Sequence, residues 1–78
     1  MIPRKRDGRI LYNVKTDRWD VWDVYSKPVA LHCGECFEIK LGDHFLSCRI
    51  EMDSEWVIYL SNTRFHLHPK VSYWIRVE

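Results

Sequence analysis

Hydrophobic and polar residues alternate in short runs along most of this chain. In the clearest run, Phe37, Ile39 and Leu41 alternate with two charged residues. A period of two is typical of a β-strand with one buried and one solvated face, and no stretch keeps the 3.6-residue period of an amphipathic helix. The pattern therefore predicts six strands, over residues 9–14, 18–25, 37–41, 44–52, 56–60 and 71–77.

Short polar segments separate the predicted strands. Lys15–Asp17 and Asp53–Glu55 are expected to be turns, and Gly42 with Asp43 is a two-residue hairpin signal. Ser26–Ala30 is expected to be a connection, because its proline has no N–H for a ladder, and Phe65–Lys70 is expected to be a loop. Closure of many short strands removes exposed sheet edges. We therefore expect an all-β fold, a small five- to six-stranded antiparallel barrel, SH3-like, with an OB-like barrel as the second choice.

The strand predicted over 18–25 has an unusual pattern. Trp19 shares one parity with Val21, whereas Trp22 shares the other with Val24. The strand is then buried on both sides, or a bulge shifts its register, or one tryptophan is exposed for a purpose.

The length of 78 residues allows one domain with a modest core. Residues 1–8 contain Pro3 and Gly8 and are expected to form a basic flexible arm, which leaves 9–78 as a single small barrel domain. No apolar segment follows the basic N-terminus, and no run approaches the roughly 20 residues that cross a bilayer. The odd cysteine number of three argues against a secreted disulfide framework, so we expect a cytoplasmic protein without a membrane partner.

Aromatic residues make up 14% of the chain, more than so small a core is expected to hold. Protein-binding hot spots favour Trp, Tyr and Arg. We expect the outer-face rings and arginines, with one of the two tryptophans in 18–25, to form a surface for a host protein. The candidate residues are Trp19, Trp22, Phe45, Arg49, Tyr59, Trp74 and Arg76.

A nucleic-acid partner is the alternative. Rings and cations also suit single strands, whose bases stack while Lys and Arg bind phosphates. The only cationic cluster is Arg4, Lys5, Arg6 and Arg9. The net charge is only +1, and nucleic-acid modules are usually clearly basic, so a protein partner is favoured.

The cysteines raise a second alternative. Cys33 and Cys36 have the spacing of half a zinc site, and Cys48 and His66 could complete it. No second paired half-site is present. Cys48 shares its parity in the 44–52 strand with Leu46, Ile50 and Met52, so we expect it to be a small hydrophobic residue of the core. A redox role would need a helix N-terminus beside the pair. We expect no enzyme activity and no cofactor, because no nucleophile elbow, phosphate loop or paired acids accompany these residues.

Several short motifs in the middle of the chain carry a resemblance: Leu31–Glu35 (LHCGE), Phe37–Ile39, Arg49–Glu51 and Trp56–Leu60. With them, most of residues 10–77 resembles a family of short uncharacterised domains found on phages, plasmids and integrated elements of Gram-positive bacteria. The resemblance implies a compact β domain and supplies no activity, ligand or catalytic residue. Trp19–Tyr25 and Phe65–Pro69 have no counterpart in that pattern.

The mobile-element setting suggests the kind of binding module to expect. We expect a non-enzymatic phage or mobile-element accessory protein that binds a host protein, for example as an anti-defence inhibitor. An exposed edge strand would also allow a homodimer.

Overall fold

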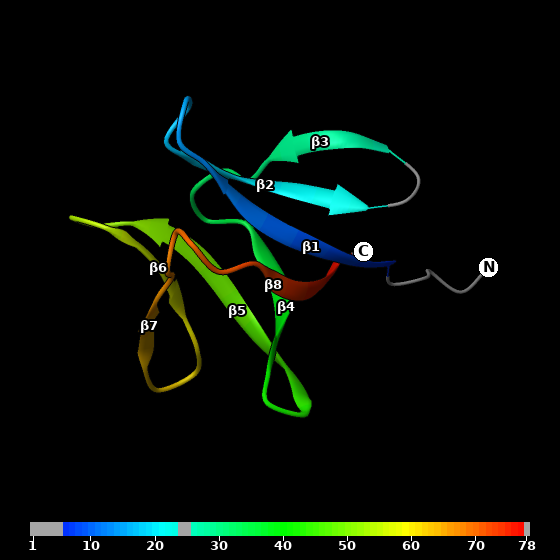
Figure 1. The fold of residues 1–78 in the computed structure, drawn as a ribbon. Helices are drawn as coiled ribbons and strands as arrows, with labels where there is room; N and C mark the ends of the chain where they lie inside the picture. The colour runs from blue at the N-terminus through cyan, green and yellow to red at the C-terminus, as the bar shows by residue number, and fades with distance from the viewer. Residues whose placement is uncertain (1–5, 24–25, 78) are drawn as a thin grey trace.

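The computed structural model describes residues 6–23 and 26–77, and all its regular elements are strands (Figure 1). They are β1 (Arg6–Asn13), β2 (Arg18–Asp23), β3 (Ser26–Ala30), β4 (Cys36–Leu41), β5 (His44–Met52), β6 (Trp56–Tyr59), β7 (Arg64–His66) and β8 (Tyr73–Val77). They form one sheet in the order β3-β2-β1-β8-β4-β5-β6-β7, and every neighbouring pair is antiparallel. No helix in the described residues is long and apolar enough to cross a membrane.

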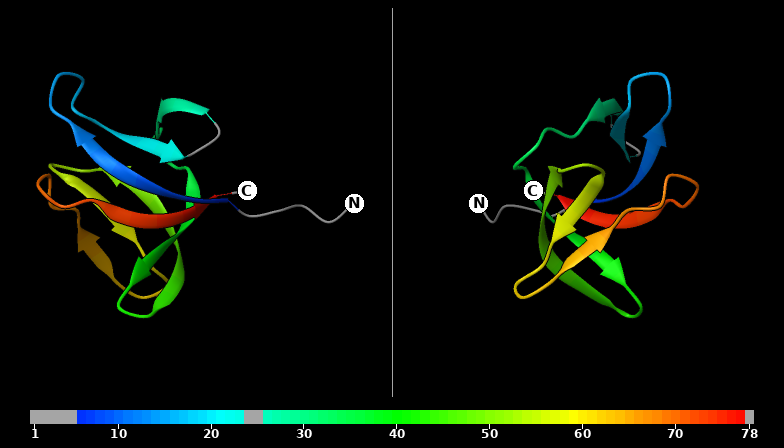
Figure 2. Two further views of the ribbon diagram at one scale, coloured as in Figure 1. Left: turned by 45° about the vertical axis from the view of Figure 1, so that its right-hand side comes forward. Right: turned by 90° about the vertical axis from the view of Figure 1, so that its left-hand side faces the viewer.

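The sheet is strongly curved but is not closed into a barrel (Figure 2). The first and last strands, β1 and β8, pair near the middle of the order, while β3 and β7 are its two ends. The curvature brings the inner faces of distant strands onto one common core. The all-β antiparallel prediction is confirmed, whereas closure into an SH3-like or OB-like barrel is not, because no ladder joins β3 to β7 in the described part of the chain.

Two of the eight strands were not predicted, and both are at an edge of the sheet. Ser26–Ala30 forms β3 in place of the expected connection, and Arg64–His66 forms β7, which includes the first two residues of the expected loop. Pro28 is compatible with β3 because an edge strand pairs on one side only. β7 has three residues, too few for a visible alternation.

The N-terminal strand begins earlier than the sequence pattern suggested. Arg6 pairs with Val77 and Gly8 with Ile75, so the last residues of the predicted arm belong to the sheet. Arg4 and Lys5 lie outside the described residues. Gly8 is needed for the close approach of β2, because an added Cβ would lie 2.8 Å from the carbonyl oxygen of Trp22.

The inner face of the sheet carries the core. Side chains with no solvent exposure come from six strands, and burial of each contributes about 1.5–3 kcal/mol. Among them, Trp19 packs against Tyr12 and Tyr73, with ring centroids 5.6 and 5.8 Å apart. The core residues are Ile10, Trp19, Leu31, Phe37, Ile39, Cys48, Ile50, Trp56, Ile58, Leu67, Tyr73 and Ile75.

The facing of β5 and β6 agrees with the predicted alternation except near the strand ends. Cys48 and Ile50 are buried as expected, but Leu46 and Met52 are 41% and 38% exposed. Both lie near an end of β5. Val57 is only 1% exposed although its parity is outward, since its neighbours in the ladder are two long side chains, Glu51 and His66.

Candidate functional site

A row of three large side chains crosses the outer face of the sheet. Arg9 on β1 is directly opposite Trp22 on β2 and Trp74 on β8. The two tryptophans are 50% and 52% exposed. The Arg9 guanidinium carbon lies 5.1 Å from the centroid of the Trp74 ring, and the group donates to the Ser72 hydroxyl. The ladder therefore presents a cation between two accessible indoles.

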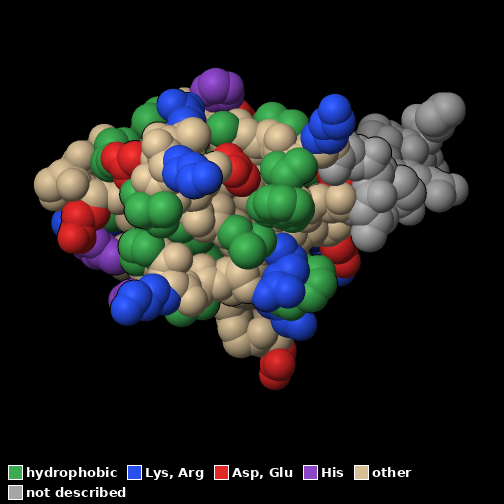
Figure 3. All heavy atoms as spheres, turned by 45° about the horizontal axis from the view of Figure 1, so that its top comes forward, with side chains coloured by type: hydrophobic (Ala, Val, Ile, Leu, Met, Phe, Trp, Pro, Cys, Tyr) green, Lys and Arg blue, Asp and Glu red, His purple; other side chains and the backbone are tan. Residues whose placement is uncertain are grey.

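Neighbouring positions extend this row into a mixed apolar and charged surface. Leu11, two residues along β1, is 40% exposed and is opposite Asp20 on β2. We call Leu11, Trp22, Trp74 and Arg9 the Trp–Arg surface. The face of the molecule drawn in Figure 3 shows the same character, with hydrophobic side chains interspersed among basic and acidic ones.

A second group of predicted residues forms two stacked pairs. Arg76 stacks on Phe45 at 3.9 Å from its centroid, and its Nε donates to Asp7 at 2.8 Å. Arg49 lies 5.3 Å from the ring centroid of Tyr59. Arg49 also pairs with Glu51 at 2.8 Å. Both arginines thus already have an aromatic and an acidic neighbour, and such exposed pairs are worth at most about 1 kcal/mol.

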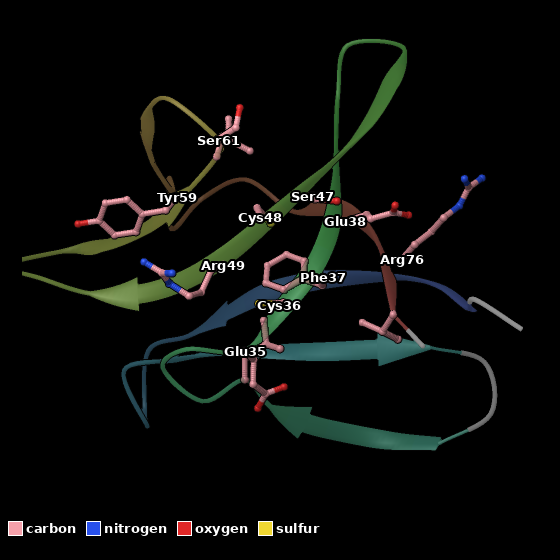
Figure 4. Close-up of a pocket in the computed structure, with 13 residues that line it drawn as sticks. Glu35, Cys36, Phe37, Glu38, Ser47, Cys48, Arg49, Tyr59, Ser61 and Arg76 are labelled. Atoms are coloured by element: carbon pink, nitrogen blue, oxygen red, sulfur yellow. The ribbon is translucent and has the colours of Figure 1, made fainter. Parts of the chain in front are cut away.

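Three members of these pairs, Arg49, Tyr59 and Arg76, line an open hollow of about 920 Å³ (Figure 4). In that view Arg49 and Arg76 lie on opposite sides of Phe37. The lining mixes carboxylates, guanidinium groups, two thiols and apolar residues, so the hollow has no single chemical character. It is lined by Leu31, Glu35, Cys36, Phe37, Glu38, Ser47, Cys48, Arg49, Tyr59, Leu60, Ser61, Arg76 and Val77.

Trp19 does not belong to a binding surface. It is fully buried at 0% exposure, so its assignment to the partner-binding set was wrong. Along β1 the alternation of β2 is unbroken, with Trp19 opposite Tyr12 on the inner face and Trp22 opposite Arg9 on the outer face. The pairing of β2 with β3 does shift its register, between Val21 and Asp23, as one of the three alternatives would require. Of the two candidate rings, Trp22 is the exposed one.

The cysteines do not come together as metal ligands. Cys33 and Cys36 are exposed, while Cys48 is buried and burial raises the pKa of its thiol to about 12. His66 instead contacts Glu55, with 2.8 Å between Nδ1 and Oε2. Within residues 6–23 and 26–77, no group of three or more His, Cys, Asp or Glu side chains is placed to hold a metal ion. The alternative zinc set is therefore not assembled.

The segment around Cys33 and Gly34 is a turn. Gly34 has a φ of 90°, a left-handed conformation that favours glycine. Its N–H donates to the Ile50 carbonyl at 2.8 Å, and the Ile50 N–H donates to the Glu35 carbonyl at 3.1 Å. These bonds fix the turn against β5 immediately before β4 begins at Cys36.

The structure describes only two of the four cations of the nucleic-acid alternative. Of its four residues, Arg9 is on the outer face of β1 within the Trp–Arg surface, and Arg6 begins β1. The other two lie outside the described residues. The sequence analysis missed Leu11. Leu11 is two residues from Arg9 in a predicted strand, so the sequence already indicated that both side chains point to the same face.

The fold and surface define a class: a small all-β domain with tryptophans and arginines exposed on its outer face. The chain belongs to the family described as domain of unknown function DUF5348, whose model matches residues 8–77. It is also similar to a crystal structure of a protein from Ruminococcus gnavus, with 33% identity and a TM-score of 0.72. That match covers 92% of this chain and 100% of the other. No curated protein matches at a significant level.

Proposed function

We propose that this domain is a non-enzymatic module that binds a host protein through the Trp–Arg surface. The observation that carries the proposal is the register of β2, β1 and β8, which places Trp22, Arg9 and Trp74 side by side and facing outward. Half-exposed tryptophans are uncommon on monomeric domains, and contiguous exposed apolar side chains mark interaction surfaces.

The surface favours one kind of partner segment. Arg9 presents an exposed positive charge, and Trp22 and Trp74 present apolar area on both sides of it. The complementary segment has a carboxylate flanked by apolar side chains. Arg can bind that carboxylate through two parallel N–H groups, whereas Lys would act as a single point charge.

A capture experiment tests the proposal. The tagged domain is exposed to a lysate of the cells that naturally carry it, and retained proteins are identified by mass spectrometry. We expect Trp74→Ala to weaken the main partner at least roughly tenfold, the size of a hot-spot loss. Val14→Ala is the matched control, because Val14 is 79% exposed at the β1–β2 turn, outside the Trp–Arg surface.

The charge of Arg9 gives a second, sharper comparison. Arg9→Glu is expected to abolish binding, because it would face the partner's carboxylate with a like charge. Arg9→Lys is expected to retain part of the affinity. Equal retention by all three forms of the protein would refute the proposed partner chemistry.

A single-stranded nucleic acid is the second candidate, favoured by Arg9 lying over the Trp74 ring at a distance suited to joint stacking and phosphate contact. In that case oligo-dT would quench tryptophan fluorescence, and the affinity would fall steeply with salt and on deletion of residues 1–5. No quenching at low salt would remove this candidate.

The setting of the module is part of the same proposal. We place it in the cytoplasm, as an accessory protein of a phage or mobile element that acts on a host protein, for example as an anti-defence inhibitor. A homodimer through an edge strand is the other assembly to test, by light scattering, since β3 and β7 each pair on one side only among the described strands.

A further inference from the structure

A second hollow lies at one end of the molecule, away from the Trp–Arg surface. There the β1–β2 turn, the β5–β6 turn and the β7–β8 loop lie at the same end of the curved sheet (Figures 1 and 2). We call this hollow of about 480 Å³ the loop-end pocket. Its lining is Tyr12, Asp17, Trp19, Met52, Ser54, Glu55, Trp56, His66, Leu67, His68 and Pro69. Its volume is in the range of about 300–1,000 Å³ that small-molecule sites occupy.

The chemistry of this lining is one-sided. It contains two carboxylates, Asp17 and Glu55, and no lysine or arginine. Apart from Ser54 and two histidines, His66 and His68, the rest is aromatic or apolar. Trp19 has no exposed surface and closes the floor, so ligand contact falls to the half-buried Tyr12, the 9% of the Trp56 surface that is exposed, and the exposed Met52. A negative, aromatic-walled hollow is complementary to an organic cation.

Asp17 is held in place by residues from two separate parts of the sheet. The Trp56 indole N–H donates to the Asp17 carbonyl at 3.0 Å and to its Oδ1 at 3.4 Å, and the Tyr12 hydroxyl donates to the same Oδ1. The backbone φ of Asp17 is 53°, in the left-handed region that non-glycine residues seldom adopt. The carboxylate is therefore oriented in advance, with Oδ2 as the oxygen that a ligand would contact.

Glu55 supplies the second charge from the β5–β6 turn. Its Oε2 lies 2.8 Å from Nδ1 of His66, which also lines the pocket, and its side chain is 69% exposed and open to a ligand. The neighbouring acid of the same turn, Asp53, is directed elsewhere, because it accepts hydrogen bonds from Tyr59 and Arg64. Only one of the two acids in the β5–β6 turn thus belongs to the lining.

We propose that the loop-end pocket binds an organic ammonium group between the Asp17 and Glu55 carboxylates and the Tyr12 and Trp56 rings. The group is either a small free amine or the side chain of a lysine in a peptide, since both present the same charge. This site shares no residue with the Trp–Arg surface, so either proposal can fail alone.

The test uses choline as the charged probe and its neutral isostere 3,3-dimethyl-1-butanol as the matched control. Binding is followed by ¹H–¹⁵N spectra, which report each residue separately. We expect choline to shift the signals of Asp17, Glu55 and Trp56 saturably, and the neutral isostere to leave them unchanged. Equal shifts with both compounds, or no saturation with choline, would overturn the proposal. A titration with Nα-acetyl-lysine amide distinguishes the two sources of the ammonium group.

Variants keep the test independent of folding. Glu55→Gln is expected to weaken choline binding about tenfold, a change of 1.4 kcal/mol, and Asp17→Asn at least as much. Asn tolerates the left-handed conformation, and its amide oxygen accepts the same hydrogen bonds, so the Asp17→Asn fold should persist. Asp53→Asn is the control and should bind choline like the unmodified protein. Unchanged affinity in Glu55→Gln and Asp17→Asn would refute the role of the carboxylates.

Discussion

Trp19 and Trp22 are three residues apart on the same strand, yet one is buried and the other is exposed. Trp19 is 0% exposed among core rings, whereas Trp22 is 50% exposed beside Arg9. The difference arises from the pleat, because residues of opposite parity point to opposite faces of a sheet. The comparison shows that identical side chains serve stability on the inner face of this fold and are available for binding on the outer face.

The largest expected effect concerns the inner ring. Trp19→Ala should lower the free energy of unfolding by about 3–5 kcal/mol, because it leaves a cavity between Tyr12 and Tyr73. Urea denaturation followed by circular dichroism measures the change. The free energy of unfolding of so small a domain is low, so partial unfolding of Trp19→Ala at room temperature would also agree with the prediction. A loss below about 1 kcal/mol would mean that the inner face is not the core.

A smaller loss is expected where β2 approaches β1. The added methyl group in Gly8→Ala would meet the Trp22 carbonyl oxygen at 2.8 Å, so the backbone of one strand must move. We expect a cost of about 1–3 kcal/mol, typical of overpacking. Thermal unfolding measures it, and the amide signal of Trp22 should shift as well. Unchanged stability together with an unchanged Trp22 signal would show that the Trp22 carbonyl oxygen is further than 2.8 Å from a Cβ at position 8.

The cysteines show the same difference between the two faces, in the reactivity of their thiols. Cys36 is exposed on the outer face of β4, and Cys48, buried on the inner face of β5, has a thiol pKa raised by burial to about 12. At pH 8 a disulfide reagent should modify two thiols in the folded protein and three in denaturant. Rapid reaction of all three without denaturant would contradict the burial of Cys48.

The raised pKa also gives a dependence of stability on pH. The neutral Cys48 thiol contributes its full stability below the ordinary cysteine pKa of 9.0, and this contribution is lost as pH rises toward about 12. The difference in unfolding free energy between the unmodified protein and Cys48→Ala should therefore narrow from pH 8 to pH 11. A constant difference would argue against the shift.

The smallest effect on stability is expected on the outer face. Trp22→Ala should change the free energy of unfolding by less than about 1 kcal/mol, since only cross-strand contacts are lost. Its partner binding should nevertheless fall strongly. Chemical denaturation and quantitative capture measure the two properties on the same preparation. A stability loss as large as that of Trp19→Ala would assign Trp22 to the core.

The alternation of hydrophobic and polar residues could predict which face of the sheet a residue occupies, but not which strands pair. The period of two correctly placed Ile39, Ile50 and Ile75 inside and Trp74 outside. It could not show that β1 pairs with β8, because that contact joins residues at opposite ends of the chain. The Trp–Arg surface depends on this pairing, so Trp22, Arg9 and Trp74 were separate candidates in the sequence.

The remaining differences also have physical reasons. β3 was missed because Pro28 argues against a strand except at an edge, and edge position is a property of the whole sheet. Trp19 was assigned to a surface because its strand carries apolar residues of both parities. The loop-end pocket joins a residue of the β1–β2 turn to one 39 positions later, which no local pattern can show.

The most direct test of the central claim is a quantitative capture experiment with four proteins: the unmodified domain, Trp22→Ala, Trp74→Ala and Val14→Ala. All four should unfold at similar denaturant concentrations. We predict that one host protein is retained equally by the unmodified domain and Val14→Ala, and at least roughly tenfold less by both tryptophan variants. Retention of the same proteins in the same amounts by all four would contradict a binding role for the Trp–Arg surface.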